Sequence, residues 1–219
     1  MQSTKETFNP EDMYHMFDLK RLNNEIWYYK NVLSYPKELC NFVEDVEKDI
    51  RSFSKISPWS IWTASDDKET TFGFNKEINS AYLINTGDER LDQKLKYIEN
   101  SFVMAFEFSL SNYLASHGLD KDLYELRLDT IPIRKWTAGS YMGPHCDTYD
   151  GNMDLAFSMI AYLNDDYEGG EINFPNHGVS IKPEPGSLVI FPSQEPYLHQ
   201  VRQITAGERY TCHLSVYKK

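Results

Sequence analysis

The chain has 219 residues, of which 41% are hydrophobic, so it is long enough and apolar enough to bury the core of one folded domain. Its formal net charge of -11 disfavours a broad nucleic-acid-binding face, because phosphates would be repelled. No apolar run reaches the roughly 18 residues of a membrane span, and the polar opening MQSTKETFNPEDMYH lacks the layout of a signal peptide. We therefore expect a soluble protein of the cytoplasm, with neither membrane nor nucleic acid as a partner.

The three cysteines, Cys40, Cys146 and Cys212, stand singly along the chain. No Cys-x-x-Cys pair suggests a zinc ribbon, and the spacing does not resemble a disulfide framework. We expect reduced thiols.

The first 26 residues are polar and have no sustained apolar period, and we expect them to form an N-terminal arm. Residues 27–219 are predicted to form a single domain, in which a helical brace over 27–123 precedes a strand-rich core over 124–217. Residues 53–86 combine aromatic and polar side chains, which favours irregular structure with short strands.

Two helices are predicted in the brace. From Pro36, apolar residues recur every three or four positions as far as Ile50, which is the pattern of a helix with one buried face. A longer stripe follows, in which Asp88 can cap the N-terminal end and Gly118 can close the C-terminal end. His117 lies in the last turn of this helix, where we expect a structural role.

After Leu119 the sequence becomes rich in β-branched and aromatic residues interrupted by turn signals, most clearly at 150–152, 183–186 and 205–207. The predicted strands are 124–137, 155–163, 171–174, 178–182, 187–191, 197–202 and 209–217. Helices that precede a series of strands indicate an α+β fold, with the helices on one side of an antiparallel sandwich or barrel.

His145 and Asp147 lie two residues apart, so on an extended segment their side chains project from one face and can bind one metal ion. Such a pair is weak evidence alone, since roughly one is expected by chance among six histidines. His199 supplies a third ligand downstream. Two histidines and one carboxylate form a facial triad that leaves three iron positions open. A catalytic zinc ion with an open position stays an alternative.

Arg209 and Thr211 share one face of the last predicted strand. A guanidinium beside a hydroxyl can hold a carboxylate through charge-assisted hydrogen bonds, whereas a surface salt bridge is the plain alternative for an arginine. The triad spacing upstream makes the carboxylate clamp the preferred interpretation.

Three stretches carry a family resemblance: RKWTAGSYMGPHCD at 134–147, AYLNDDYEGGEINFP at 161–175, and His199 followed by GERYT at 207–211. In this order they resemble the prolyl 4-hydroxylase-like Fe(II)/2-oxoglutarate-dependent dioxygenases, over about residues 124–217. The resemblance implies a double-stranded β-helix (a jelly-roll or cupin-like barrel) braced by N-terminal helices.

The resemblance also implies that His145, Asp147 and His199 bind Fe(II), and that Arg209 and Thr211 hold the far carboxylate of 2-oxoglutarate. The implied activity is hydroxylation of an amino-acid residue, with proline as the first candidate, in a peptide or protein. Dioxygen is the oxidant, succinate and carbon dioxide are the co-products, and ascorbate is a candidate reductant.

Three positions depart from the family pattern. Arg209 stands where proline-hydroxylating members often have lysine, and both side chains bind carboxylates. A cosubstrate-binding tyrosine is common where this chain has Met142; Tyr141 lies one residue earlier and would reach the cosubstrate only through a bulge. Leu155 stands where peptide-binding members often have arginine, so a free amino acid or another small molecule stays an alternative substrate.

Other polar residues have plainer interpretations. His213 shares the face of Arg209 and can either line the pocket or lie hydrogen-bonded in the interior. His177 fits a loop, and Ser158 has no histidine and acid around it that would make it a nucleophile. Trp136, Tyr162 and Phe191 fit the core or the pocket wall.

From a different class, a metal-binding β-barrel without turnover remains an alternative to the enzyme. Specificity in such barrels depends on loops, here 53–86 and 148–154, whose sequences do not identify a substrate. The oligomeric state is not indicated by any pattern.

Overall fold

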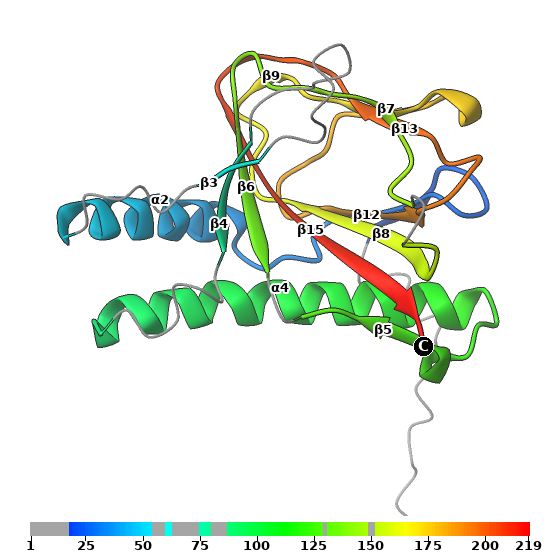
Figure 1. Cartoon of the computed structure of the whole chain (residues 1–219), viewed down its shortest axis with the longest axis horizontal. Coiled ribbons are helices and arrows are strands. Elements are labelled where there is room, and N and C mark those ends of the chain that lie inside the picture. Colours follow the sequence, from blue (N-terminus) through cyan, green and yellow to red (C-terminus); the bar gives the residue numbers. More distant parts are fainter. Residues whose placement is uncertain (1–17, 54–59, 63–74, 80–86, 129–130, 149–151) are drawn as a thin grey trace, which may run out of the picture.

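The computed structural model describes residues 18–53, 60–62, 75–79, 87–128, 131–148 and 152–219. Figure 1 shows strands stacked in two layers, with helix α4 along the outer side of one layer. The long helices are α2 (Pro36–Phe53) and α4 (Glu89–Ser116), and the short 3-10 helices are η1 (Lys121–Leu123) and η2 (Pro175–His177).

The major sheet has nine strands within the described residues, all paired antiparallel. Its order is β1 (Leu19–Arg21), β2 (Trp27–Tyr29), β12 (Leu188–Pro192), β8 (Leu155–Tyr162), β15 (Glu208–Lys218), β6 (Pro132–Thr137), β4 (Asn75–Asn79) and β3 (Ser60–Trp62), with β5 (Tyr124–Leu126) paired to β15.

The minor sheet has four strands in the order β11 (Val179–Ile181), β10 (Ile172–Phe174), β13 (His199–Val201) and β7 (Met142–His145). A separate pair joins β14 (Ile204–Ala206) to β9 (Glu168–Gly169). Two antiparallel sheets with helices outside one of them agree with the α+β class expected from the sequence.

Both predicted helices are present. The side chain of Asp88 accepts a hydrogen bond from Leu91 N at 3.1 Å, which caps α4 as expected. Gly118 follows the helix with φ +65°, a conformation that glycine adopts without strain. His117 has the expected structural role, because its ring packs on Tyr113 at 4.2 Å between centroids and its Nδ1 lies 2.8 Å from Tyr113 O.

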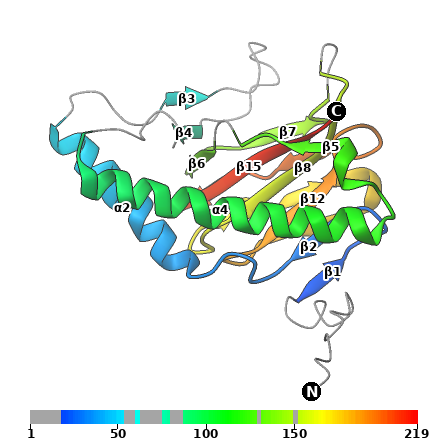
Figure 2. The ribbon, with the colours of Figure 1, turned by 90° about the horizontal axis from the view of Figure 1, so that it is seen from below.

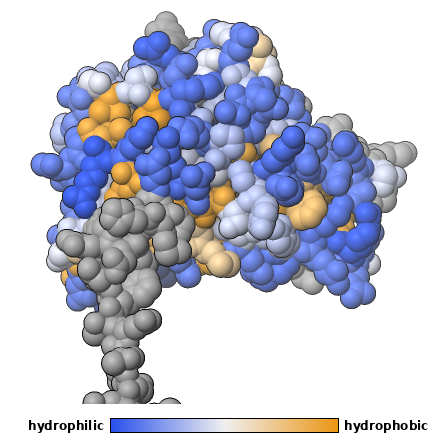
Figure 3. Space-filling view, turned by 180° about the vertical axis from the view of Figure 1, so that it is seen from behind, coloured by the Kyte–Doolittle hydropathy of each residue, from blue (hydrophilic) through white to orange (hydrophobic). Residues whose placement is uncertain are grey.

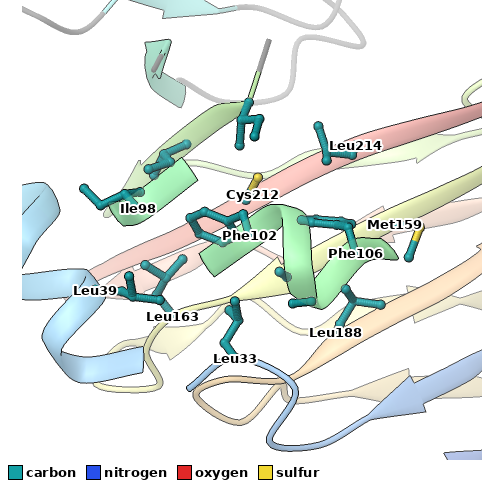
Figure 4. Close-up of a cluster of buried hydrophobic side chains, with 14 of the residues drawn as sticks. Leu33, Leu39, Ile98, Phe102, Phe106, Met159, Leu163, Leu188, Cys212 and Leu214 are labelled. Atoms are coloured by element: carbon teal, nitrogen blue, oxygen red, sulfur yellow. The ribbon is translucent and has the colours of Figure 1, made fainter. Parts of the chain in front are cut away.

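The central strands are buried on both faces, so alternate residues enter different cores. On β12, Leu188 and Ile190 join the core between the major sheet and the helices, whereas Val189 and Phe191 join a second core between the two sheets. Figure 2 shows α2 and α4 crossing the same outer face of the major sheet. Figure 4 shows side chains of both helices meeting those of β8, β12 and β15 there. The inner core places the opposite faces of these strands around the pocket described below.

Several strand predictions need correction. The range 124–137 contains two strands, β5 and β6, which pair with different parts of β15. Strand β7 was not predicted, because Gly143 and Pro144 are residue types that disfavour a strand. Proline is tolerated there because β7 is an edge strand of the minor sheet. Strand β14 occupies part of the range 205–207 that we predicted as a turn.

Strand β1 lies inside the range predicted as an arm and pairs with β2, which follows that range. The boundary between arm and domain at residue 26 stays a prediction. The short strands expected within 53–86 include β3 and β4. The remainder of that region, most of the arm and part of the loop 148–154 lie outside the described residues.

Figure 3 shows that the face seen from behind is mainly hydrophilic, with a few small apolar areas. In the described part of the chain, neither long helix has the length and apolar character to cross a bilayer.

The fold makes a direct stability prediction for α4. Phe102 has no exposed surface and belongs to the core against the major sheet, whereas Met104, two residues later, is 71% exposed. We expect Phe102→Ala to lower the free energy of unfolding by about 3–5 kcal/mol, because it removes buried surface and leaves a cavity. Met104→Ala should change it by less than about 0.5 kcal/mol. Urea unfolding followed by circular dichroism measures both, and equal effects would contradict this packing.

Candidate metal centre and its pocket

Three side chains from the two layers converge at one point. His145 ends β7 and His199 begins β13, and the two residues are direct partners in the minor sheet. Asp147 follows two residues after His145. His145 Nε2 lies 3.3 Å from Asp147 Oδ1, and His199 Nε2 lies 3.6 Å from Asp147 Oδ2. One donor atom from each of the three residues lies within 4.8 Å of the others, which is the spacing of ligands around one ion.

Backbone acceptors orient both imidazoles. His145 Nδ1 lies 2.9 Å from Gly143 O, and His199 Nδ1 lies 3.2 Å from Tyr197 O. Because a carbonyl oxygen only accepts, each Nδ1 carries the hydrogen in the neutral ring, and each Nε2 presents a lone pair toward Asp147. Two nitrogen lone pairs and a carboxylate that face one another repel unless a cation lies between them. The donor set therefore fits a metal ion.

Burial and neighbouring charges set the protonation states of these groups. Burial lowers the pKa of His199 to about 4, which keeps its ring neutral at neutral pH. Burial acts to raise the pKa of Asp147, but the positive charge that the facing imidazoles of His199 and His145 carry when protonated outweighs it and holds that pKa well below its ordinary value. Burial also acts to lower the pKa of His145, but its contacts with Asp147 and Gly143 O outweigh this and raise it. Asp147 is therefore ionised and ready to bind a cation.

The triad opens into a cavity of about 240 Å³ between the two sheets. Its lining residues come from β6, β7, the segment that follows β7, β8, β13 and β15: Arg134, Trp136, Met142, His145, Cys146, Asp147, Ile160, His199, Val201, Arg209, Thr211 and His213. The cavity thus combines an apolar wall of Trp136, Met142, Ile160 and Val201 with a metal-binding group and two arginines.

Arg209 is 1% exposed, and its Nη1 donates to Gly170 O at 3.0 Å. Its guanidinium lies 4.8 Å from the ring centroid of Trp136 and 5.2 Å from that of Tyr162. Arg209 Nε has no hydrogen-bond partner, and no carboxylate among the described residues forms an ion pair with Arg209. A buried cation without an anion is costly, so this site fits the carboxylate of a ligand.

Two neighbours of Arg209 add polar groups to the same wall. Thr211 Oγ1 accepts a hydrogen bond from Trp136 Nε1 at 2.9 Å, which leaves the proton of its hydroxyl available to a ligand. The hydroxyl of Tyr162 is buried and has no hydrogen-bond partner within the described part of the chain. The place of Tyr162 on a predicted strand indicates the core or the pocket wall, but no sequence pattern indicates that its hydroxyl lies beside Arg209.

The structure also places the remaining candidates. Met142 lines the cavity, whereas Tyr141 is 38% exposed and does not, so the pocket geometry lends no support to the predicted contact of Tyr141 with a cosubstrate. The two residues project from opposite sides of an extended chain. Leu155 is 4% exposed and belongs to the core. His213 lines the cavity, with Nε2 4.0 Å from Asp147 Oδ2, and His177 ends the η2 turn.

Two serines behind the triad were not identified as site residues from the sequence. Ser158 Oγ donates a short hydrogen bond to Asp147 Oδ2, and Ser193 Oγ lies 2.7 Å from Ser158 Oγ. The sequence offers Ser158 only as a nucleophile without a histidine and acid around it. Its contact with Asp147 depends on strand pairing that sequence spacing does not reveal.

Comparison with known proteins agrees with this geometry. Residues 132–217 match the family model of the 2OG-Fe(II) oxygenase superfamily. A PKHD-type hydroxylase of Prochlorococcus marinus (strain NATL2A) is 38% identical over 80 residues, which are 34% of this chain and 35% of that protein. A PKHD-type hydroxylase of Synechococcus sp. (strain CC9605) is 30% identical over 116 residues, 50% of this chain and 51% of that protein. The matches therefore span about a third to a half of these relatives' length.

Solved structures resemble the whole fold. A prolyl hydroxylase from Trichoplax adhaerens, in complex with a hypoxia inducible factor peptide fragment, superposes with a TM-score of 0.61 at 18% identity, over 90% of this chain and 84% of that one. A viral collagen prolyl hydroxylase from Paramecium Bursaria Chlorella virus-1 gives 0.56 at 17% identity, over 89% and 97%. The likeness confirms the expected double-stranded β-helix.

The family model covers the strands that carry His145, Asp147 and His199, and the pairing of β7 with β13 brings these side chains together. Residues 132–217, which are less than half of the chain, are therefore similar to the 2OG-Fe(II) oxygenase superfamily.

Proposed function

We propose that this protein is an Fe(II)/2-oxoglutarate-dependent dioxygenase that hydroxylates an amino-acid residue in a peptide or protein, with proline as the first candidate. One observation carries the proposal: the three candidate metal-binding side chains line a single cavity with a buried arginine, Arg209, that has no carboxylate partner among the described residues. A metal ion and a small diacid are the ligands that this combination fits.

The three-ligand metal site fits an ion that keeps open coordination positions. Among the described residues, the donor group has three members, His145, Asp147 and His199. A closed structural zinc site takes four protein ligands, whereas a facial triad leaves adjacent positions for a chelating cosubstrate and dioxygen. His145 and His199 offer Nε2, because their Nδ1 atoms are engaged with backbone carbonyls.

The far side of the cavity supports a dicarboxylate. Arg209 has an unpartnered Nε, Thr211 can donate its hydroxyl proton, and Tyr162 has a free buried hydroxyl. Together they can hold one carboxylate away from the metal while the other end of the ligand reaches the triad. Trp136 and the apolar lining between the two ends exclude water from the ligand.

When bound, Fe(II), 2-oxoglutarate and O2 supply the oxidation: one oxygen atom of O2 enters the substrate as a hydroxyl and the other enters succinate, with release of CO2. The chain's own residues orient the reactants. His145 and His199 present neutral nitrogens, Asp147 presents a negative charge, and Arg209 fixes the cosubstrate by its distal carboxylate.

The substrate class rests on analogy with relatives. The solved structures with a similar fold include prolyl hydroxylases, one of them with a peptide bound. A second candidate, hydroxylation of a free amino acid or other small molecule, is favoured by one observation: Leu155 is a buried core residue that offers no charge to a peptide.

The cytoplasm remains the proposed location, since Cys40, Cys146 and Cys212 are free thiols. Ascorbate remains a proposed reductant.

The first test is anaerobic titration of Fe(II) and then 2-oxoglutarate, followed by the visible absorption of an iron-bound keto acid. Wild type should develop the band. His145→Ala should lose it, because the triad is broken. Arg209→Met should need at least about tenfold more 2-oxoglutarate, because a charge-assisted pair contributes roughly 1.5–3 kcal/mol.

The matched control is Arg202→Met, which removes an exposed arginine on the loop between β13 and β14. This variant should titrate like wild type. If wild type shows no band, or if Arg209→Met matches Arg202→Met, the triad or the carboxylate clamp is misassigned.

Metal affinity should depend on pH through His145. Because the pKa of His145 is raised above its ordinary value of about 6.5, this ring is the ligand that holds a proton to the highest pH, and the metal must displace that proton. Affinity for Fe(II) should be constant above the raised pKa and fall about tenfold for each pH unit below it. His199, with its pKa lowered to about 4, should add no further loss until more acid conditions. Anaerobic calorimetry between about pH 8 and 5.5 measures this, and a flat profile would contradict it.

Turnover separates an enzyme from a non-catalytic metal-binding barrel. The iron-loaded protein in air should convert 2-oxoglutarate slowly to succinate, and Asp147→Ala should abolish this conversion because it removes a ligand. A proline-containing peptide should accelerate succinate formation if the substrate is a residue in a peptide or protein. Free proline should do so if the substrate is a free amino acid. Complete absence of succinate from wild type would favour the binding module.

A further inference from the structure

Two buried hydroxyls lie directly behind the carboxylate of the triad. Ser158, on β8, and Ser193, which follows β12, are both 0% exposed. Ser158 Oγ donates to Asp147 Oδ2, and the two serine Oγ atoms are 2.7 Å apart. Because a buried hydroxyl is costly unless it is hydrogen-bonded, these two serines are tolerated through their bonds to each other and to Asp147.

The chemistry of these groups determines which atom donates in each of the two hydrogen bonds. An ionised carboxylate only accepts hydrogen bonds, so the single hydroxyl proton of Ser158 is committed to Asp147. Ser193 must then donate its own proton to Ser158 Oγ. The order Ser193 to Ser158 to Asp147 is one in which each bond polarises and strengthens the next.

Ser193 also holds the backbone beside the carboxylate. Its carbonyl oxygen accepts from Asp147 N at 3.0 Å and from Thr148 N at 3.2 Å, and its own N–H donates to Ala156 O at 3.0 Å. Asp147 lies beyond the end of β7, outside any strand. The end of β12 therefore fixes its main chain, while β8 and Ser193 together fix its side chain.

We propose that Ser158, supported by Ser193, is the positioning residue of Asp147. The hydroxyl engages Oδ2, so the carboxylate presents its other oxygen to a bound metal ion; that oxygen, Oδ1, is the one 3.3 Å from His145 Nε2. A carboxylate that binds through one oxygen leaves three positions open on a six-coordinate ion, whereas chelation through both would fill one of them. This inference rests on the metal site of the proposed function.

No other described group takes over this task. Oδ2 lies 3.6 Å from His199 Nε2, which presents a lone pair, and 4.0 Å from His213 Nε2, which is too far for a hydrogen bond. Removal of the hydroxyl therefore frees the carboxylate to rotate. A purely structural role would instead make Ser158 a small side chain that fills space between strands, and its hydroxyl would then have no effect on the metal.

The experiment compares the variants Ser158→Ala, Ser193→Ala and the double variant with wild type. Ser109→Ala is the matched control, because Ser109 is also 0% exposed, lies on α4 in the other core, and has a hydroxyl with no hydrogen-bond partner among the residues that the structure describes. Co(II) is titrated anaerobically into each protein, and both the dissociation constant and the visible spectrum, which reports coordination number, are recorded. Thermal unfolding of the metal-free proteins shows whether each variant is folded.

Ser158→Ala should bind Co(II) about 10-fold or more weakly, as is typical when a partner of a metal ligand is lost, with an altered visible spectrum. Ser193→Ala should have a smaller effect in the same direction. The double variant should resemble Ser158→Ala, because Ser193 acts through Ser158 and the two effects are not additive. Ser109→Ala should match wild type in affinity and spectrum.

The proposal is overturned if Ser158→Ala and the double variant bind Co(II) with the affinity and spectrum of wild type. The double variant guards against misfolding of Ser158→Ala, because it leaves no unpartnered hydroxyl on Ser193. Failure of wild type itself to bind Co(II) would count against the metal site of the proposed function, and is thereby distinguished from a failure of the positioning role.

Discussion

The register of β15 between β6 and β8 determines which side chains reach the pocket, and the rest of the site depends on it. In the observed register, Arg209 lies opposite Trp136, and Thr211 lies opposite both Tyr162 and Arg134. A slip of one residue would turn Arg209 out of the cavity, because side chains alternate along a strand. The register is secured because the alternate residues of β15 are buried against the helices, so a slip would place polar groups in that core.

The pocket concentrates groups that a protein interior stabilises poorly. A guanidinium without a carboxylate, an ionised aspartate and two imidazole lone pairs lie around one small cavity. Their desolvation is offset only in part by contacts within the chain, and a cation with a diacid would complete them. The metal- and cosubstrate-loaded protein should therefore be more stable than the free protein, since ligands that bind only the folded state stabilise it.

Support for the triad comes from both layers of the barrel. The minor sheet sets the two histidines opposite each other, and backbone carbonyls fix their rings. The major sheet holds Asp147 through Ser158 and Ser193. A metal centre built between two sheets has its geometry fixed before any ligand arrives, which limits the reorganisation needed when metal and cosubstrate bind.

The sequence by itself determined the features that depend on local pattern. Periodicity and caps located α2 and α4, and a facial triad with a downstream arginine singled out His145, Asp147, His199 and Arg209, which the structure brings into one cavity. That these residues bind iron and 2-oxoglutarate stays a prediction. The family motifs at 134–147 and 161–175 indicated the barrel, which the structure confirms.

Only the tertiary structure decided the features that depend on pairing between distant segments. Gly143 and Pro144 give β7 a low local strand propensity, so the sequence did not predict it. Pairing with β13 makes this segment a strand. The pocket contains Met142 and not Tyr141, and Ser158 supports Asp147 across strands that are far apart in sequence. Local patterns fix which face of an element is apolar, but contacts between elements are set by register and packing, and those are properties of the whole fold.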